Sequence, residues 1–180
     1  VKEVYRLAPK RKKTILLITG LKLLKGETEQ VRQILESLAR NNPENFGIHA
    51  RLGLFYRSTG RYEETVKTLE KAFSLNPSAV DLLRIIADVY MEQGKFQQAY
   101  RTIEKSMQQT GKDDEARLEN LKGEIMQKHG REDTALAHFQ EAARLDPKLI
   151  EPALHSAEIY LRQKKFDRAA EFFRKAADID

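Results

Sequence analysis

The chain repeats itself at intervals of 34 residues, and this period constrains its fold more than any other feature. Two sets of residues mark the period independently. The first is a series of glycines spaced 34, 34 and 36 residues apart: Gly26, Gly60, Gly94 and Gly130. The second is a series of prolines with the same period and the same two extra residues: Pro9, Pro43, Pro77 and Pro147. Both series place an insertion between residues 107 and 116. Because two independent series agree on the period and on the insertion, we treat the period as a structural unit.

Between the markers, small and apolar residues follow a helical spacing. Lys164 stands 34 residues after Gly130 and takes the place of the next glycine. Seven residues before Gly60, Gly94, Gly130 and Lys164 lies a small residue: Gly53, Ala87, Gly123 and Ala157. Four before each marker lies a large apolar one: Tyr56, Tyr90, Met126 and Tyr160. Nine after it lies another large one: Leu69, Ile103, Phe139 and Phe173. Spacings of 3, 4 and 7 around a glycine turn predict two amphipathic helices packed as a hairpin. No segment alternates with period 2, so no strand is predicted.

These residues resemble the tetratricopeptide repeat, a helix–turn–helix unit of 34 residues. The clearest copies are 49–77 and 83–107. The resemblance implies an all-α fold, a right-handed α-solenoid of antiparallel helix hairpins whose first helices line a concave groove. The chain departs from the family pattern where the usual Trp is expected. The residues in its place are Ile15, His49, Leu83, Glu119 and Ala153.

The register predicts a single solenoid domain of five repeats and the end of a sixth. Residues 1–11 would be the tail of a preceding repeat and its turn. The five repeats would be 12–45, which is degenerate, 46–79, 80–115 with the two-residue insertion, 116–149 and 150–180. We expect the chain to be part of a longer array. We also expect the apolar edge formed by Phe166, Phe172 and Phe173 to be covered by a further repeat or by self-association.

The residue types exclude several classes of function. The chain has 180 residues and no Cys, so disulfides, thiol nucleophiles and cysteine-ligated metals are absent. No apolar run approaches the ~18–20 residues of a membrane span. No glycine-rich phosphate loop or Ser–His arrangement occurs. We therefore predict no catalytic residue and no cofactor. The absence of Cys fits both cytoplasmic and periplasmic proteins and leaves the compartment open.

One trio has metal-like spacing. Glu151, His155 and Glu158 stand at i, i+4 and i+7 on one helix face. The resemblance places polar residues on this groove-lining stripe in any case, and three ligands from one helix would make a weak site. We therefore predict no metal site.

The concave wall is the predicted partner-binding site. Charged stripes are usually solvated helix faces, but a rigid concave groove is suited to an extended peptide or a partner helix. The register assigns thirteen residues to this wall: Arg51, Leu54, Arg57, Asp81, Arg84, Asp88, Met91, Arg117, Asn120, Glu124, Glu151, His155 and Glu158. The predicted function is a non-catalytic protein–protein interaction scaffold that forms part of a larger assembly.

A specialised form of such grooves can be excluded. Co-chaperone members of the family bind acidic chaperone tails through a clamp of Lys, Asn and Arg side chains. None of the three possible frames supplies that set; the last one reads Arg84, Asp88, Leu121, Glu151 and His155. The acidic residues of the wall would also repel an acidic tail.

The alternative function rests on the basic end of the chain. Residues 1–25 carry a net charge of +7, whereas the remaining 155 sum to −2. Lys10, Arg11, Lys12 and Lys13 could dock on nucleic acid or on an anionic membrane surface. Nucleic acid is the weaker choice, because Tyr5 is the only aromatic residue near this cluster.

Overall fold

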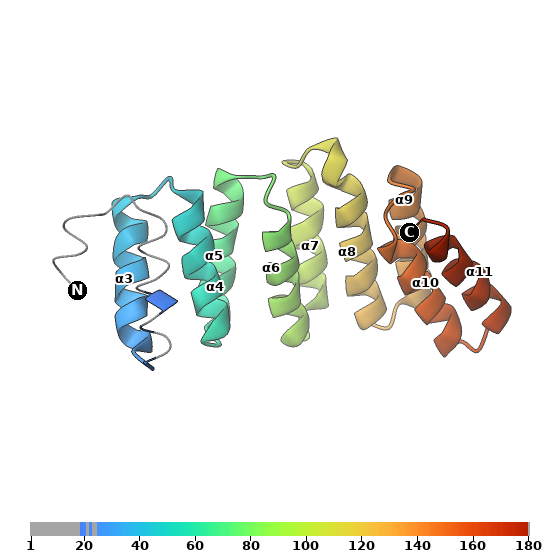
Figure 1. Cartoon of the computed structure of the whole chain (residues 1–180), viewed down its shortest axis with the longest axis horizontal. Coiled ribbons are helices and arrows are strands. Elements are labelled where there is room, and N and C mark those ends of the chain that lie inside the picture. The colour runs from blue at the N-terminus through green and yellow to red at the C-terminus, as the bar shows by residue number, and fades with distance from the viewer. Residues whose placement is uncertain (1–18, 21, 23–24, 180) are drawn as a thin grey trace.

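A computed structural model describes residues 19–20, 22 and 25–179 (Figure 1). The described part consists of helices and contains no strand. The helices, in chain order, are α3 (Thr28–Asn41), α4 (Phe46–Ser58), α5 (Tyr62–Leu75), α6 (Asp81–Glu92), α7 (Phe96–Met107), the short 3-10 helix η1 (Lys112–Asp114), α8 (Glu115–Lys128), α9 (Glu132–Leu145), α10 (Glu151–Arg162) and α11 (Phe166–Ala177). The predicted all-α solenoid of helix hairpins is confirmed. None of the described helices is long and apolar enough to cross a bilayer.

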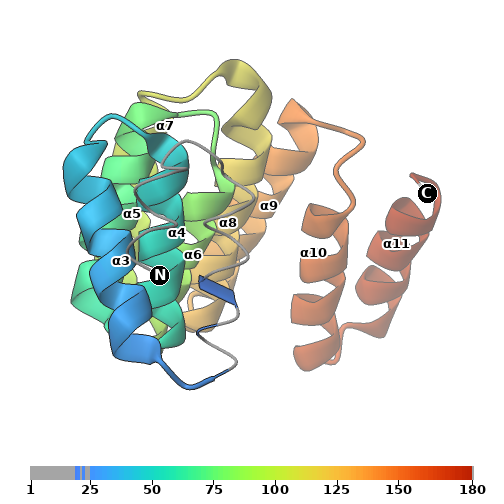
Figure 2. The same ribbon diagram turned by 60° about the vertical axis from the view of Figure 1, so that its left-hand side comes forward.

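The helices pack in antiparallel pairs that stack along one axis. The pairs are α4 with α5, α6 with α7, α8 with α9, and α10 with α11; α3 packs on α4. Each pair then packs its second helix against the first helix of the next pair. Figure 2 shows the stack with α3 at one end and α10 and α11 at the other.

The first helices of the pairs, α4, α6, α8 and α10, form one side of the stack. Helix α8 lies directly against α6 on one side and against α10 on the other. Among the described residues, no second helix packs in this way on the next second helix. At α6, α8 and α10 the first helices are therefore the more closely spaced, and this part of the solenoid curves toward them. We call the face that they share the first-helix wall.

Each periodic glycine ends a helix in the left-handed region of backbone conformation. Gly60 has φ +71°, and its N–H donates to the Arg57 carbonyl at 3.2 Å. The next N–H, of Arg61, donates to the Tyr56 carbonyl at 2.9 Å. This pair of hydrogen bonds is a Schellman cap, which requires a positive φ and so favours glycine. The last hairpin has the same two bonds, but Lys164 occupies the position with φ +58°.

The periodic small residues mark the closest approach of the two helices in a hairpin. A Cβ atom added to Gly123 would lie 2.4 Å from Cε1 of Phe139, and one added to Gly53 would lie 2.3 Å from Cδ2 of Leu69. Ala87 fills the same position in its hairpin with no exposed surface. The spacing therefore leaves no room for a Cβ atom at Gly53 and Gly123, and it holds a methyl group at Ala87.

The apolar core is continuous from one hairpin to the next. One cluster of buried side chains extends from Val66 on α5 to Ile159 on α10, and a second joins α3 to α4. The two-residue insertion lies in the connection between α7 and α8, outside both helices. The insertion therefore lengthens a surface connection without interrupting the core.

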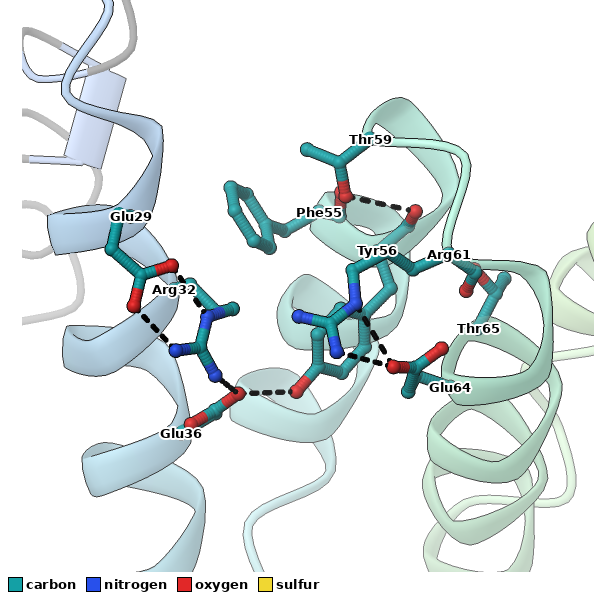
Figure 3. Close-up of polar contacts among 9 residues, drawn as sticks. All are labelled: Glu29, Arg32, Glu36, Phe55, Tyr56, Thr59, Arg61, Glu64 and Thr65. Atoms are coloured by element: carbon teal, nitrogen blue, oxygen red, sulfur yellow. Dashed lines mark hydrogen bonds and ion pairs between the residues drawn. The ribbon is translucent and has the colours of Figure 1, made fainter.

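A polar chain also ties α3 to the first complete hairpin (Figure 3). The Tyr56 hydroxyl donates to Oε1 of Glu36 at 2.8 Å, and Nη1 of Arg32 donates to the same oxygen at 2.6 Å. Burial and this hydrogen bond raise the pKa of the Tyr56 hydroxyl to about 12. The Arg61 guanidinium lies over the Tyr56 ring, 5.2 Å from its centroid.

Glu119, at one of the positions where the family pattern expects Trp, lies in a buried polar cluster. Its carboxylate accepts from Nζ of Lys122 at 2.9 Å and lies 2.7 Å from Nδ1 of His138 on α9. The Tyr100 hydroxyl on α7 lies 3.2 Å from the other ring nitrogen. Burial alone would raise the pKa of Glu119, but the bonds from His138 and Lys122 lower it below its ordinary value. The cluster replaces an apolar contact among α7, α8 and α9 with hydrogen bonds.

Replacing Lys164 with glycine should stabilise the protein. A left-handed conformation costs an L-residue roughly 1–2 kcal/mol, part of which is offset by the greater entropy of glycine in the unfolded chain. We expect Lys164→Gly to raise the free energy of unfolding by about 0.5–1 kcal/mol, measured by urea denaturation. The reverse change, Gly130→Lys, should lower it by about 1 kcal/mol. A neutral or destabilising Lys164→Gly would contradict the strain assigned to this turn.

The close approach at Gly123 should not tolerate an added methyl group. We expect Gly123→Ala to lower the free energy of unfolding by about 1–3 kcal/mol, because Phe139 must move out of its packed position. Gly111→Ala is the matched control, since its φ is −72° and no atom lies within 4 Å of the added Cβ. Equal effects of the two substitutions in urea denaturation would show that the hairpin contact is not the cause.

Candidate functional site

The predicted groove residues all lie on the first helices, and the structure pairs most of their charges. Arg57 on α4 donates to Glu92 on α6, with Nη1 at 2.7 Å from Oε2. Arg84 on α6 binds both carboxylate oxygens of Glu124 on α8, at 2.6 and 2.8 Å. Arg117 on α8 pairs with Asp81 on α6. These three ion pairs join successive first helices, and we call them the cross-helix ladder.

Glu124 is the centre of this arrangement. Besides Arg84, it accepts a hydrogen bond from Nδ2 of Asn120 at 2.8 Å, and Nε2 of His155 on α10 lies 3.5 Å from its Oε1. Burial would raise its pKa, but the bonds from His155 and Arg84 lower it to about 2. The same contact with Glu124 raises the pKa of His155 against the effect of burial. His155 also stacks on the Phe139 ring, with centroids 5.1 Å apart. One carboxylate thus links three successive first helices.

A cavity of about 340 Å³ lies beside Glu124. It is lined by Arg84, Arg117, Asn120, Glu124, Leu149, Glu151 and His155. We call it the wall cavity. Two of its lining side chains have a buried polar atom with no hydrogen-bond partner in the described part of the chain: Oδ1 of Asn120 and Nδ1 of His155. Such atoms are rare in folded proteins and often mark a place for a ligand or water.

The other predicted groove residues differ in their surroundings. Leu54 is exposed over 45% of its surface, whereas Met91 is only 7% exposed and belongs to the core. The assignment of Met91 to the groove surface is therefore corrected, because its side chain packs beneath the wall. Arg51 and Asp88 have no ion-pair partner among the described residues. Burial lowers the pKa of Arg51 and raises that of Asp88.

Two other sequence-based candidates have different outcomes. The basic patch Lys10, Arg11, Lys12 and Lys13 lies outside the described residues. The metal-like trio on α10 is not gathered around a common point: within the described part of the chain, no three His, Asp or Glu side chains are placed to hold a metal ion. Instead, Glu158 lies 3.8 Å from His155, and Glu151 forms no ion pair with any residue that the structure describes.

The last hairpin exposes several large apolar side chains. Phe166 is 65% exposed, Phe173 is 40% exposed and Leu161 on α10 is 43% exposed. Phe172 packs on the Tyr160 ring with centroids 5.4 Å apart. Of the predicted apolar edge, Phe166 and Phe173 on α11 are therefore exposed, while Phe172 contributes less to it.

The sequence did not predict a second cavity, which lies among α9, α10 and α11. It has a volume of about 590 Å³, and its lining includes Leu136, Phe139, Tyr160, Phe172 and Ile179. These residues come from two successive hairpins. Their distance from one another depends on how two hairpins stack, which the spacing within one repeat does not specify.

Sequence models described as tetratricopeptide repeat match three parts of the chain. They cover residues 46–78, 78–148 and 127–180, and so together span 46–180. A search of curated proteins found no match to the sequence.

Many solved structures share this fold. A structure titled "Crystal structure of MamA" superposes with a TM-score of 0.65 at 18% identity, covering 90% of this chain and 94% of that one. PilF of Pseudomonas aeruginosa gives 0.65 at 18% identity, covering 93% and 76%. YrrB, titled a TPR protein with an unusual peptide-binding site, gives 0.58 at 16% identity, covering 99% and 91%. At these identities the likeness concerns the fold.

The pKa of Glu124 predicts a pH-dependent stability. The folded-state pKa of Glu124 is about 2, below the ordinary 4.5. Its contribution to the free energy of unfolding is therefore present above pH 4.5 and is lost as the pH falls toward 2. His155 has the opposite pH dependence, because its pKa is raised in the folded state. Its contribution to the free energy of unfolding is present below its ordinary pKa of 6.5 and is lost as the pH rises through its folded-state pKa. We expect Glu124→Gln to lower the free energy of unfolding by about 2–3 kcal/mol near pH 5.

Urea denaturation of wild type and Glu124→Gln at pH 2.5, 3.5, 5 and 7 measures this effect. The difference in free energy of unfolding between wild type and Glu124→Gln should become smaller below pH 4.5. Glu104→Gln removes an exposed carboxylate from α7 and should change stability by less than about 0.5 kcal/mol at every pH. A Glu124→Gln difference that is independent of pH would show that the carboxylate charge is not the source of the stabilisation.

Proposed function

Because this chain belongs to the tetratricopeptide repeat family, we propose that it is a non-catalytic scaffold that binds a partner protein on the first-helix wall. Proteins of this family generally mediate protein–protein interactions and assemblies. The proposed binding surface consists of the exposed parts of α4, α6, α8 and α10. The bound element would be a segment of the partner, either extended or helical.

The cross-helix ladder is the observation that carries this proposal. Arginine side chains lose considerable rotamer freedom when they bind a partner. On this wall, Arg57, Arg84 and Arg117 are already held by carboxylates of the neighbouring helix. A partner would therefore meet a surface whose shape and charge are largely fixed before binding, which favours affinity. On a charged face that is only solvated, these side chains would not have to be paired from one repeat to the next.

The wall cavity supports the proposal, since it brings two buried polar atoms that have no hydrogen-bond partner among the described residues next to charged side chains on three helices. Leu54 adds an exposed apolar contact on α4. YrrB, a protein of similar fold, is described as having an unusual peptide-binding site. That likeness makes a peptide a reasonable class of partner here.

Two other contact surfaces stay predictions. Docking of Lys10–Lys13 on nucleic acid or an anionic membrane concerns residues that the structure does not describe. Self-association would use the exposed Phe166 and Phe173 of the last hairpin. The first-helix wall is preferred, because it has a preformed polar site among the described residues.

Photo-crosslinking tests the proposed surface. A benzoylphenylalanine at Leu54 lies on the first-helix wall, whereas one at the exposed Gln98 lies on the second helix α7. In extract of the organism that makes this protein, we expect a protein crosslinked from position 54 and not from position 98. Each variant should keep the wild-type circular dichroism spectrum. Crosslinks from position 98 alone, or none from position 54, would refute binding at the wall.

A further inference from the structure

We propose that the wall cavity receives a basic side chain of the partner, a lysine or arginine, held between the Glu151 carboxylate and the Asn120 amide oxygen. This inference rests on the proposed function, because it specifies the chemistry of the segment that binds the first-helix wall. It goes further by naming the cavity that is occupied, the positive charge of the partner side chain, and the two groups of the wall that recognise it. The way in which each polar group around the cavity is paired supports this assignment.

The cations around the cavity are already engaged. Arg84 donates through both terminal nitrogens to Glu124. Arg117 pairs with Asp81 and lies 3.4 Å from Oδ1 of Asp114. An acidic ligand would have to compete with these carboxylates for the guanidinium groups. The cavity is therefore poorly suited to an acidic partner.

Carboxylates outnumber cations around the cavity. The charged lining residues and their ion-pair partners comprise three cationic side chains, with His155 counted as protonated, and five carboxylates: Arg84, Arg117, His155, Asp81, Asp114, Glu124, Glu151 and Glu158. Asp88 adds a further negative charge close to Arg84, and Lys128 adds a positive charge close to Asp88, so that the excess of carboxylates remains. The local excess of negative charge attracts a cation.

Two acceptors of the cavity lining lack partners within the described part of the chain. Glu151 is exposed and forms no ion pair there, although it lies close enough to Arg84 to affect the pKa of that residue. Asn120 is 3% exposed, and its Nδ2 is committed to Glu124 at 2.8 Å. That bond fixes the orientation of the amide, so the unpartnered Oδ1 can only accept a hydrogen bond. An ammonium or guanidinium group could serve both acceptors at once.

The dimensions of the cavity agree with this occupant. A volume of about 340 Å³ accommodates the end of a long side chain together with water, and it is too small for a helix. Leu149 provides the apolar contact that the methylene groups of lysine or arginine use when their charged end is bound. The remainder of the partner would lie along the wall outside the cavity.

Nuclear magnetic resonance titration tests the proposal. Three dodecapeptides of Gly and Ser, carrying two lysines, two glutamines or two glutamates at the same positions, are added to ¹⁵N-labelled protein at low salt. We expect the lysine peptide to bind at least about fivefold more tightly than the glutamine peptide, and the glutamate peptide to bind more weakly than both. The largest shifts should include the side-chain amide of Asn120.

Variants then locate the charge that is responsible. Glu151→Gln should reduce the advantage of the lysine peptide at least about threefold, since it removes the unpaired carboxylate while leaving an exposed polar side chain. Glu104→Gln removes the same charge from α7 and should leave the advantage unchanged. Thermal unfolding of both variants should match wild type, because both positions are exposed.

Each remaining outcome overturns the inference. Equal binding of all three peptides, preference for glutamate, lack of binding by any of them, or a lysine preference that Glu151→Gln leaves intact would each refute a cation site here. None of these results affects the crosslinking from Leu54, which tests the wall as a whole. The proposed function can therefore stand if the cation site fails, and failure at position 54 would remove both.

Discussion

The structure depends on one point in each hairpin at which the two helices approach so closely that only a small side chain fits between them. Gly53 faces Leu69 and Gly123 faces Phe139 at distances that leave no room for a Cβ atom. Helices held this close expose a shallow groove in which the first helix of the next hairpin packs, so the buried cluster continues from α5 to α10. Stacking of this kind also brings successive first helices within reach of each other's long side chains.

That spacing converts charges that are distant in sequence into bonds between repeats. Arg57 meets Glu92, and Arg84 meets Glu124, because each pair lies on neighbouring first helices. Exposed ion pairs contribute only about 0–1 kcal/mol each, so the ladder as a whole is not the main source of stability. Glu124 is the exception, because it is mostly buried and accepts bonds from α6 and α10 as well as from its own helix. The main effect of the ladder is to fix the orientation of the charges that a partner meets.

The sequence predicted the parts of this structure that recur, and it missed those that depend on one particular contact. The glycine series predicted the helix ends, because a positive φ favours glycine regardless of its neighbours. The pairing of the groove charges was not predicted, since it depends on how two hairpins are offset. Met91 was misassigned because a helical register specifies a direction only to within about a residue, and its flexible side chain packs inward. Two residues after the turn glycine, Tyr62 and Phe96 are aromatic, but Glu132 is not. Its carboxylate instead accepts hydrogen bonds from Gln163 and Arg162 of the next hairpin.

Pairing also determines which charges of the wall are left for a partner. In the sequence, the numbers of cations and carboxylates on the first helices are nearly equal. This count alone suggests that neither end of the wall carries an excess of one charge. Once the ladder is formed, the charges left without an ion pair on the described first helices include Arg51 on α4, Asp88 on α6, Lys128 on α8 and Glu151 on α10. A segment lying across the four first helices would therefore meet the positive charge of Arg51 at one end and the negative charge of Glu151 at the other. Its own charge distribution would then decide the direction in which it binds, since the reversed orientation places like charges together.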